Sequence, residues 1–364
     1  MRPEPVEGPL RLRQAQPAGQ VSLAEHTTLR IGGPARRLIE VDSEPELIKT
    51  VSELDSAGEP VLILGGGSNL LISDDGFAGT VVKIATRGID EDVAACSGAV
   101  ITVAAGEPWD PLVAYAVERE WSGLEAMSGI PGLVGATPIQ NVGAYGAEVS
   151  QLISMVRTFD REAGRVKTFF PVECGFGYRS SRFKHPAAGE RPGRYVVLSV
   201  TFQLRLGSLS APVRYPELAR SLGIAVGDRA PVAEVRAAVL ALRAGKGMVL
   251  NPDDYDTWSA GSFFTNPIID PAAADRLPAA APRFSQPDGM IKTSAAWLIE
   301  AAGFGRGYGS GPARLSSKHT LALTNRGSAR ADDVLALARE IRAGVEGAYG
   351  ITLVPEPMLI GCAL

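Results

Sequence analysis

The stretch GIPGLVGATPIQNVGAYG, residues 129–146, constrains the fold of this chain more than any other part of it. Glycine fills five of its eighteen positions, so the stretch is too broken for a helix, yet it is too apolar for a linker. Glycine lets the main chain approach a ligand closely, and loops of this kind wrap ligands with backbone atoms. A purely structural loop is the alternative, and the number of glycines favours ligand contact.

A second glycine-rich turn, GGGSN at residues 65–69, follows the apolar run PVLIL. Consecutive backbone N–H groups in such a turn form a nest for an anion, and Ser68 and Asn69 add side-chain donors, so a diphosphate fits. No Gly-Lys-Ser/Thr follows, and Leu70 stands where the last glycine of GxGxxG belongs. A phosphate-binding P-loop and a Rossmann domain are therefore not supported, while a tight structural turn is the plain alternative.

The 129–146 stretch suits a flavin, which needs an apolar slot for its ring system and backbone polar groups at the ring edge. The residues expected to contact the cofactor are Gly65, Gly66, Gly67, Ser68, Asn69, Gly129, Ile130, Pro131, Gly132, Gln140, Asn141, Gly143, Ala144 and Gly146.

The bulk composition is that of an ordinary globular protein, with 364 residues, 45% hydrophobic and 21% charged, and the length favours more than one domain. The formal net charge of −4 disfavours nucleic acid or an anionic membrane as the main partner. Three scattered cysteines and three histidines predict a reducing compartment, no disulfide and no metal site. No apolar run is long enough for a transmembrane helix, and residues 1–20 are expected to be a disordered leader.

The pattern of apolar residues predicts a mixed α+β chain, because helices and strands do not alternate strictly. Ser43 and Asp110 are the expected N-caps of the first two helices. Helices are expected within residues 43–58, 111–121, 231–246, 294–307 and 329–350. Strands are expected within residues 26–41, 60–72, 77–86, 94–106, 154–160, 165–170, 194–206, where apolar residues alternate with period two, 320–326 and 351–361.

Three further motifs carry groups of chemical interest. In YRSSRFK, residues 178–184, the Arg179 guanidinium offers a planar fork that matches a carboxylate, although a solvated basic loop is the default reading. In GSFFTNP, residues 261–267, the aromatic neighbours shield the Ser262 hydroxyl from water, so that it can deliver a proton. Two prolines flank Glu356 in VPEPM and fix its backbone. Each motif alone also fits an ordinary structural residue.

The two glycine-rich stretches resemble the FAD-binding domain of the vanillyl-alcohol-oxidase/PCMH type. Together with YRSSRFK, AGSFFTNP and VPEP, in this order, they resemble the loop-bearing (type I) subtype of the UDP-N-acetylenolpyruvoylglucosamine reductase (MurB) family over residues 28–361. The resemblance implies an FAD-binding domain of two lobes plus a C-terminal α+β substrate-binding domain. The expected parts are residues 21–90 with 346–364, residues 91–246, and residues 247–345.

The resemblance also implies an activity: NADPH-dependent, FAD-mediated reduction of UDP-N-acetyl-3-O-(1-carboxyvinyl)-glucosamine to UDP-N-acetylmuramate, in peptidoglycan synthesis. It implies a non-covalent flavin and a cytoplasmic monomer. By resemblance, Arg179 polarises the substrate carboxylate, Ser262 protonates the carbanion-like carbon, and Glu356 acts with Arg179 on the enolic intermediate. The residues that it places at the substrate are Tyr178, Tyr215, Lys246 and Asn266.

Two other functions compete with this one. An FAD-linked alcohol or sugar oxidase of the same superfamily would attach its flavin through His or Cys, and neither glycine-rich stretch contains one. A non-catalytic flavin-binding protein would not need the Arg, Ser and Glu motifs. Two stretches have no role that the sequence fixes: GFGRGYGSG at 303–311, read as a helix stop and surface loop, and SSKHT at 316–320.

Overall fold

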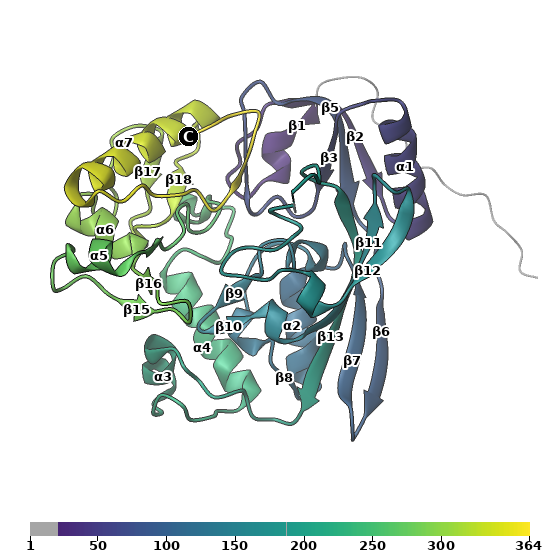
Figure 1. The fold of residues 1–364 in the computed structure, drawn as a ribbon, viewed down its shortest axis with the longest axis horizontal. Coiled ribbons are helices and arrows are strands. Elements are labelled where there is room, and N and C mark those ends of the chain that lie inside the picture. Colours follow the sequence, from purple (N-terminus) through teal and green to yellow (C-terminus); the bar gives the residue numbers. More distant parts are fainter. Residues whose placement is uncertain (1–20, 187) are drawn as a thin grey trace, which may run out of the picture.

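The computed structural model describes residues 21–186 and 188–364, so the expected leader at 1–20 lies outside the described residues. A parallel sheet forms the part shown in purple in Figure 1. Its order is β1 (Val21–Ser22), β2 (Pro34–Val41), β5 (Phe77–Ile84) and β3 (Val61–Leu64), with β1 antiparallel at the edge. Helix α1 (Glu44–Ser56) covers one face by burying Leu47, Val51 and Leu54.

An antiparallel sheet continues the same hydrophobic core. Its order is β12 (Arg165–Phe169), β11 (Ile153–Asp160), β13 (Tyr195–Leu206), β7 (Gly98–Ala104) and β6 (Ile89–Ala94), and β8 (Trp121–Ser122) pairs with the end of β13. Helix α2 (Trp109–Glu118) packs on this sheet through Trp109, whose ring lies 6.0 Å from that of Phe202. The expected period-two pattern in β13 is wrong for its first part, which is buried on both faces.

The C-terminal part, green to yellow in Figure 1, has its own core. Helix α7 (Ala331–Tyr349) packs against α6 (Ala295–Ala301) and against the hairpin of β17 (Ala313–Leu315) and β18 (Leu323–Asn325). Leu29, Ile31 and Leu71 from the N-terminal part enter the same core. The remaining elements here are α5 (Pro271–Asp275) and the small sheet β14 (Ile268–Ile269), β16 (Ile291–Lys292) and β15 (Phe284–Ser285).

Two helices, at the bottom of Figure 1, lie in the chain between the antiparallel sheet and the C-terminal part. They are α3 (Pro216–Leu222) and α4 (Val232–Gly245), which share a small core around Leu218 and Val239. The short elements are the β9–β10 hairpin (Gly143–Ala144, Ala147–Glu148) and the 3-10 turns η1 to η6 (Leu23–His26, Glu125–Met127, Val134–Ala136, Val149–Gln151, Pro171–Glu173, Tyr255–Thr257).

The chain returns after α7 to the N-terminal part. Strand β19 (Met358–Ile360) pairs in parallel with β4 (Leu70–Ile72), so the strand expected at 351–361 begins only after its second proline. Before it, the Thr265 N–H donates to Val354 O and the Glu356 N–H to Phe263 O. These bonds place the segment that holds Glu356 between the C-terminal part and the glycine-rich turn that precedes β4.

The expected helix caps need correction. Helix α2 begins at Trp109 with Pro108 at its N-cap, so Asp110 lies inside the first turn. Its carboxylate instead accepts from the Gly129 N–H at 2.6 Å and pairs with Arg236. Ser43 occupies the N-cap position of α1, but its side chain makes no capping hydrogen bond.

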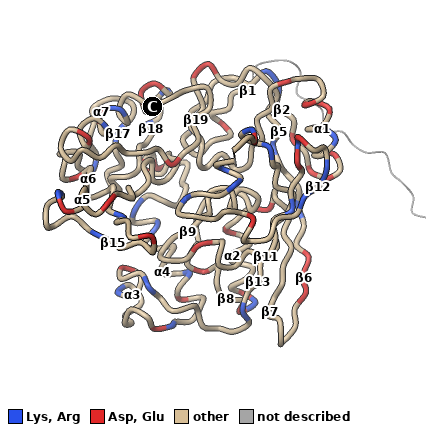
Figure 2. The backbone as a smooth tube through the Cα atoms, viewed as in Figure 1, with Lys and Arg blue, Asp and Glu red and all other residues tan. Residues whose placement is uncertain are grey.

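Charged residues of both signs are interspersed over the chain, as Figure 2 shows. Among the described residues, no helix combines the length and the apolar character that crossing a bilayer requires.

Candidate active site

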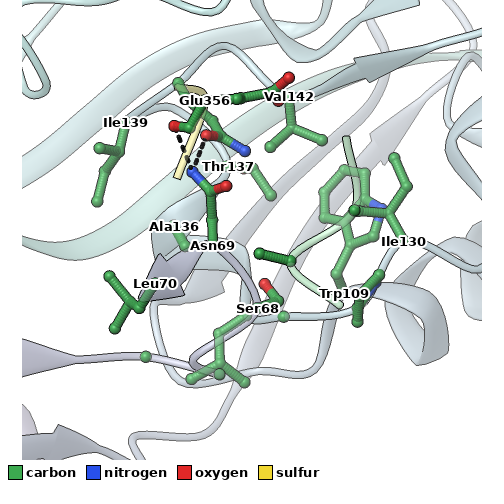
Figure 3. A pocket seen from close by; sticks show the side chains of 18 of the residues that line it. Ser68, Asn69, Leu70, Trp109, Ile130, Ala136, Thr137, Ile139, Val142 and Glu356 are labelled. Atoms are coloured by element: carbon green, nitrogen blue, oxygen red, sulfur yellow. Dashed lines mark hydrogen bonds between the residues drawn. The ribbon is translucent and has the colours of Figure 1, made fainter. Parts of the chain in front are cut away.

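One cavity brings together segments that are far apart in the sequence, and Figure 3 shows part of its lining. It is lined by Ile63, Gly65, Gly66, Gly67, Ser68, Asn69, Leu70, Trp109, Ile130, Pro131, Gly132, Leu133, Ala136, Thr137, Ile139, Gln140, Val142, Gly143, Arg179, Lys184, Arg243, Met248, Ala260, Gly261, Ser262, Glu356 and Met358.

The two glycine-rich stretches touch each other backbone to backbone at one wall of this cavity. A Cβ atom on Gly66 would lie 2.7 Å from the Cα of Gly132, closer than real side chains approach. Gly67 has a φ of 61°, and a Cβ there would lie 1.8 Å from the carbonyl oxygen of His26. Glycine is therefore required at position 66 for the turn after β3 to close against residues 129–146, and at position 67 for the turn to lie against His26.

Asn69 joins three segments at the far end of this turn. Its side-chain amide donates to the side-chain oxygen of Gln140 and to the backbone carbonyl of Glu356, the latter at 3.3 Å (Figure 3). Its own carbonyl accepts from the Met358 N–H at 3.0 Å. Asn69 thus fixes both the 129–146 loop and the segment that carries Glu356.

Arg179 and Glu356 form a largely buried ion pair in this cavity. The Arg179 Nε lies 3.0 Å from Glu356 Oε1, although its N–H is not aligned for a hydrogen bond. A second guanidinium nitrogen donates to the carbonyl of Gly143 at 2.8 Å. Arg179 has a φ of 52°, and Asn141 and Tyr145 nearby in the 129–146 loop are left-handed too. Such backbone strain persists where the surrounding structure fixes it, as at functional sites.

Two opposing effects act on the Glu356 carboxyl, which is only 9% exposed. Burial raises its pKa, and the nearby charges of Arg179 and then Lys184 oppose this, with burial the stronger effect. For Lys184, burial disfavours the charged form and therefore lowers the pKa. Its ammonium donates to the Glu356 carbonyl at 3.0 Å. A carboxyl with a raised pKa is able to hold a proton closer to neutral pH.

Ser262 reaches the cavity because the segment around it lies along the segment of Glu356. The Phe263 N–H donates to Leu321 O at 2.7 Å, and the Phe263 carbonyl accepts from the Glu356 N–H at 2.8 Å. Phe263 and Phe264 are fully buried, which anchors the preceding serine at the cavity wall. Arg179, Ser262 and Glu356 therefore line one cavity.

Four residues expected at the cofactor lie outside the lining of this cavity. Gly129 packs against Leu240 of α4. Asn141 is buried, and its amide donates to Glu148 and to the Gly177 carbonyl. Ala144 and Gly146 lie in and beside the β9–β10 hairpin.

The residues expected at the substrate fall into two groups. Tyr178 and Asn266 meet beside the cavity, where the Tyr178 hydroxyl accepts from the Asn266 N–H at 3.4 Å. The Asn266 side chain accepts from the Ala295 N–H at the start of α6. The Lys292 ammonium lies 4.7 Å from the Tyr178 ring, which leaves a positive charge over its face.

The second group is Tyr215 and Lys246, of which Lys246 lines a second cavity. Tyr215 is half exposed and meets Tyr145 edge to face at 5.4 Å, and the Lys246 ammonium pairs with Glu217. The second cavity is lined by Glu217, Ala241, Leu242, Gly245, Lys246, Ala296, Glu300, Arg306, Lys318, His319 and Thr320. Burial is the largest cause that lowers the pKa of His319, to about 4, so this imidazole is neutral at neutral pH.

The sequence alone did not single out two large side chains of the first cavity. Trp109 is buried and donates its indole N–H to Met127 O at 3.0 Å. Arg243 donates to Met248 O, its Nε has no hydrogen-bond partner, and burial lowers its pKa. A signal was present, because Arg243 follows Val239 by four residues on the buried face of α4.

The lining of the first cavity fits a flavin dinucleotide. Backbone groups of the two glycine-rich stretches form one wall, and Trp109, Ile130 and Leu133 supply an apolar wall. Arg179 and Arg243 place permanent positive charge at the cavity, which suits a diphosphate and an electron-rich ring. The absence of a Cβ at Gly66 lets the two stretches lie backbone to backbone at this wall.

Comparison with known proteins identifies the family. An FAD binding domain model matches residues 35–169, and a model of the C-terminal domain of UDP-N-acetylenolpyruvoylglucosamine reductase matches residues 252–360. The chain is 58% identical over 347 residues to the protein of that name from Cutibacterium acnes, covering 94% of this chain and 90% of the relative. It is 53% identical over 364 residues to the one from Streptomyces coelicolor, covering 97% and 92%. This chain belongs to the UDP-N-acetylenolpyruvoylglucosamine reductase (MurB) family.

A solved MurB structure, from Thermus caldophilus, has the same fold. It matches with a TM-score of 0.64 and 28% identity, covering 94% of this chain and 98% of the other. The predicted MurB resemblance is confirmed, and so is the fold class, α+β with an FAD-binding domain. FAD is the cofactor of this domain.

Proposed function

We propose that the first cavity is the active site of this MurB-family reductase and that Arg179, Ser262 and Glu356 act on the substrate there. The overall reaction is the one predicted from the sequence: reduction of UDP-N-acetyl-3-O-(1-carboxyvinyl)-glucosamine to UDP-N-acetylmuramate, with NADPH as reductant, in peptidoglycan synthesis. The observation that carries the residue assignments is that all three side chains line one cavity with the glycine-rich stretches.

The flavin, when bound, accepts hydride from NADPH and supplies it to the substrate. In our proposal, residues 65–69 and 130–132 hold FAD by backbone contacts, and Gln140 and Gly143, which line the same cavity, contact it as well. Their place in the cavity lining supports this assignment.

Arg179 binds the substrate carboxylate in this scheme. The guanidinium withdraws electron density from the conjugated double bond, so the terminal vinyl carbon becomes the site of hydride addition. The negative charge that results spreads from the adjacent carbon into the carboxylate. Arg179 stabilises this enolate-like species by charge, and Glu356, with its raised pKa, stabilises it by sharing a proton.

Ser262 completes the reaction by donating its hydroxyl proton to the carbon next to the carboxylate. Hydride at one carbon and a proton at the other convert the vinyl ether to the lactyl ether, and solvent restores the serine proton. The position of Ser262 on the cavity wall, one residue before buried Phe263, supports this role.

The UDP part of the substrate extends, in our proposal, from Tyr178 and Asn266 towards Tyr215 and Lys246 at the second cavity. Lys246, Arg306 and Lys318 give that cavity the positive charge that a diphosphate needs. Lys246 pairs with Glu217, so substrate phosphates would compete with this carboxylate for the ammonium.

We also propose the division of the chain that the resemblance implies. Residues 21–90 with 346–364 form one flavin-binding lobe, residues 91–246 the second, and residues 247–345 the substrate-binding part. The pairing of β19 with β4 supports the return of the chain end to the first lobe. A monomer in the cytoplasm, with no nucleic-acid or membrane partner, completes the proposal.

An anaerobic assay of flavin reoxidation tests this function. NADPH reduces the bound flavin in the holoenzyme, and the enolpyruvyl UDP-sugar is then added while visible flavin absorbance is followed. Rapid reoxidation with formation of UDP-N-acetylmuramate is expected. Reoxidation by oxygen coupled to oxidation of an alcohol would instead indicate an oxidase, and bound flavin that never consumes NADPH would indicate a non-catalytic protein.

A further inference from the structure

Lys184 has no part in the scheme above, although its side chain lines the active-site cavity. It lies five residues after Arg179 in the segment that leads towards β13, and it is partly buried. Its ammonium donates to the backbone carbonyl of Glu356 at 3.0 Å. The Asn69 amide donates to the same carbonyl at 3.3 Å, so two donors from different segments fix this peptide group.

The two cations that act on the Glu356 carboxyl belong to one segment of the chain. Arg179 and Lys184 face it from the segment 178–184, and Tyr178 of the same segment also senses its charge. From the segment before β4, Asn69 contributes a neutral amide. The segment of Ser262 contributes a backbone carbonyl to the Glu356 N–H. Lys184 is thus the second cation that acts on this carboxyl.

Holding a carbonyl with a partly buried cation costs desolvation free energy. Burial lowers the pKa of Lys184, and the neighbouring charge of Arg179 lowers it further, while Glu356 raises it. A neutral amide such as that of Asn69 would satisfy the carbonyl without that electrostatic cost. The charge of Lys184 therefore requires a reason beyond the hydrogen bond, and the nearby carboxyl of Glu356 provides one.

We propose that Lys184 is a positioning residue that holds the Glu356 peptide by its carbonyl and keeps the ionisation of the Glu356 carboxyl in the range in which the enzyme works. This inference rests on the proposed role of Glu356. Lys184 acts through Glu356 and does not itself exchange a proton with the substrate.

Three substitutions separate the charge of Lys184 from its hydrogen bond. Lys184→Met removes both, Lys184→Gln keeps a donor and loses the charge, and Lys184→Arg keeps the charge. Loss of a positive charge raises the pKa of a neighbouring carboxyl, by about one unit for a close partner. In Lys184→Met and Lys184→Gln, the limb of the pH profile that reports Glu356 moves to higher pH by about one unit, and in Lys184→Arg it stays near its original place.

The measurement is the pH dependence of flavin reoxidation by the enolpyruvyl UDP-sugar, in holoenzyme reduced beforehand. Glu356→Gln identifies the limb because it abolishes it. The carboxyl is also followed directly, as the 13C signal of labelled glutamate that Glu356→Gln removes, which reports the same pKa without turnover. Lys49→Met, at an exposed lysine of α1 whose side chain is 72% exposed, is the matched control and leaves both readouts unchanged.

The outcomes distinguish this inference from the proposed function. If wild-type flavin is not reoxidised by the UDP-sugar, the proposed function fails. If it is reoxidised but the Glu356 limb and 13C titration are unmoved, or move to lower pH, in Lys184→Met and Lys184→Gln, the role of Lys184 is wrong. Should Lys184→Met not fold, Lys184→Gln and Lys184→Arg give the same comparison, with flavin content as the check on folding.

Discussion

Charge at the level of single residues distinguishes the active-site cavity from the rest of the interior. Arg179, Lys184 and Arg243 line it, against the single carboxyl of Glu356. A partly buried cavity with this excess of cations attracts anions, because the surrounding protein screens charge less than water does. A carboxylate substrate and a cofactor with a diphosphate both meet that requirement.

Ser262→Ala is expected to separate the two half-reactions. The substitution removes the proton donor but leaves the glycine-rich stretches intact, so reduction of the flavin by NADPH continues at about the wild-type rate. Reoxidation by the UDP-sugar falls by about 100-fold or more, as for loss of a positioned acid. Stopped-flow absorbance of the flavin measures each step, and equal loss of both would contradict the role given to Ser262.

Asp160, at the end of β11, is expected to stabilise the fold in a pH-dependent way. Two hydrogen bonds from Arg194, at 2.8 and 2.7 Å, lower its pKa from 3.8 to about 2. Because the folded-state pKa lies below the unfolded value, this stabilisation is present above about pH 4 and is lost as the pH falls towards 2. Asp160→Asn should cost about 1 to 2 kcal/mol at neutral pH, allowing for solvent screening.

Urea unfolding of wild type and Asp160→Asn at neutral pH and near pH 3 measures this contribution. The difference between the two proteins should shrink at the lower pH. Asp92→Asn, at an exposed position of β6, is the control and should leave stability nearly unchanged. A difference that grows on acidification would contradict the assigned sign.

The contact between the two glycine-rich stretches is the element on which cofactor binding depends in our proposal. In Gly66→Ala the new Cβ would lie 2.7 Å from Gly132 Cα, so the turn after β3 and the 129–146 loop must separate. We expect FAD to bind at least about tenfold more weakly, since backbone contacts need close approach. Flavin content after purification and FAD titration measure the effect. Gly347→Ala in α7, where a Cβ meets nothing within 4 Å, is the control.

The acidic connector after α4 holds the SSKHT loop, which the sequence left without a role. Asp256 accepts from the Ser317 N–H at 2.9 Å and from Arg326 at 2.8 Å, and Asp254 pairs with Lys318 at 2.6 Å. Lys318 and its neighbour His319 line the second cavity. The connector therefore shapes the place proposed for the substrate diphosphate.

Asp256→Asn is expected to loosen this loop. The KM for the UDP-sugar should rise about tenfold, the equivalent of one charge-assisted hydrogen bond, while kcat and FAD content stay close to wild type. Steady-state kinetics with both substrates measure this. Asp253→Asn, on the exposed side of the same connector, is the matched control. Equal effects of the two substitutions would exclude a specific role for Asp256.

Sequence patterns predicted the elements that are long and amphipathic. Helices α4 and α7 bury one face each, so their periodicity is visible. Strand β6 was missed because it is polar and mostly exposed, and its pairing with β7 is what makes it a strand. Helices α3 and α5 are too short to show a period.

The motifs indicated Arg179, Ser262 and Glu356 in combination, because the resemblance to the MurB family implies their roles, whereas each motif alone also fits an ordinary structural residue. Lys184 stands in a basic segment, where a charge indicates a solvated surface, and the spacing of Arg243 from Val239 indicates only the buried face of α4. Only the packing of distant segments shows that both side chains face the cavity. Local sequence cannot contain that information.

At the scale of the whole molecule, hydrogen bonds and shared core residues connect the N-terminal and C-terminal parts. The buried Asn325 amide donates to Leu29 O at 3.0 Å and to Arg30 O at 3.3 Å, and Thr28 bonds Ser259 O at 2.7 Å. Leu29 itself is buried in the C-terminal core. The segment before β2 is thus shared between both parts, so loss of one contact affects both.

Asn325→Ala is expected to reduce the free energy of unfolding by about 1 to 3 kcal/mol, because buried carbonyls lose their donor. Flavin fluorescence should report the loss of FAD, and circular dichroism the loss of helix, as urea is raised. We expect both transitions at the same urea concentration. Gln203→Ala removes an amide that bonds an exposed carbonyl at 3.1 Å, and it should cost less than about 0.5 kcal/mol. Separate flavin and helix transitions in wild type would contradict a shared segment.

The pairing of β4 with β19 has a consequence for the polypeptide as it is made. Asn69 and the carbonyl that it bonds, that of Glu356, are 287 residues apart, which at about 5–20 residues per second corresponds to roughly 15 to 60 s of translation. For that interval β4 lacks its partner, and an unpaired strand edge recruits strands from other chains. On one messenger RNA, a strand of a neighbouring nascent chain is therefore able to pair with β4 until the ribosome has synthesised β19.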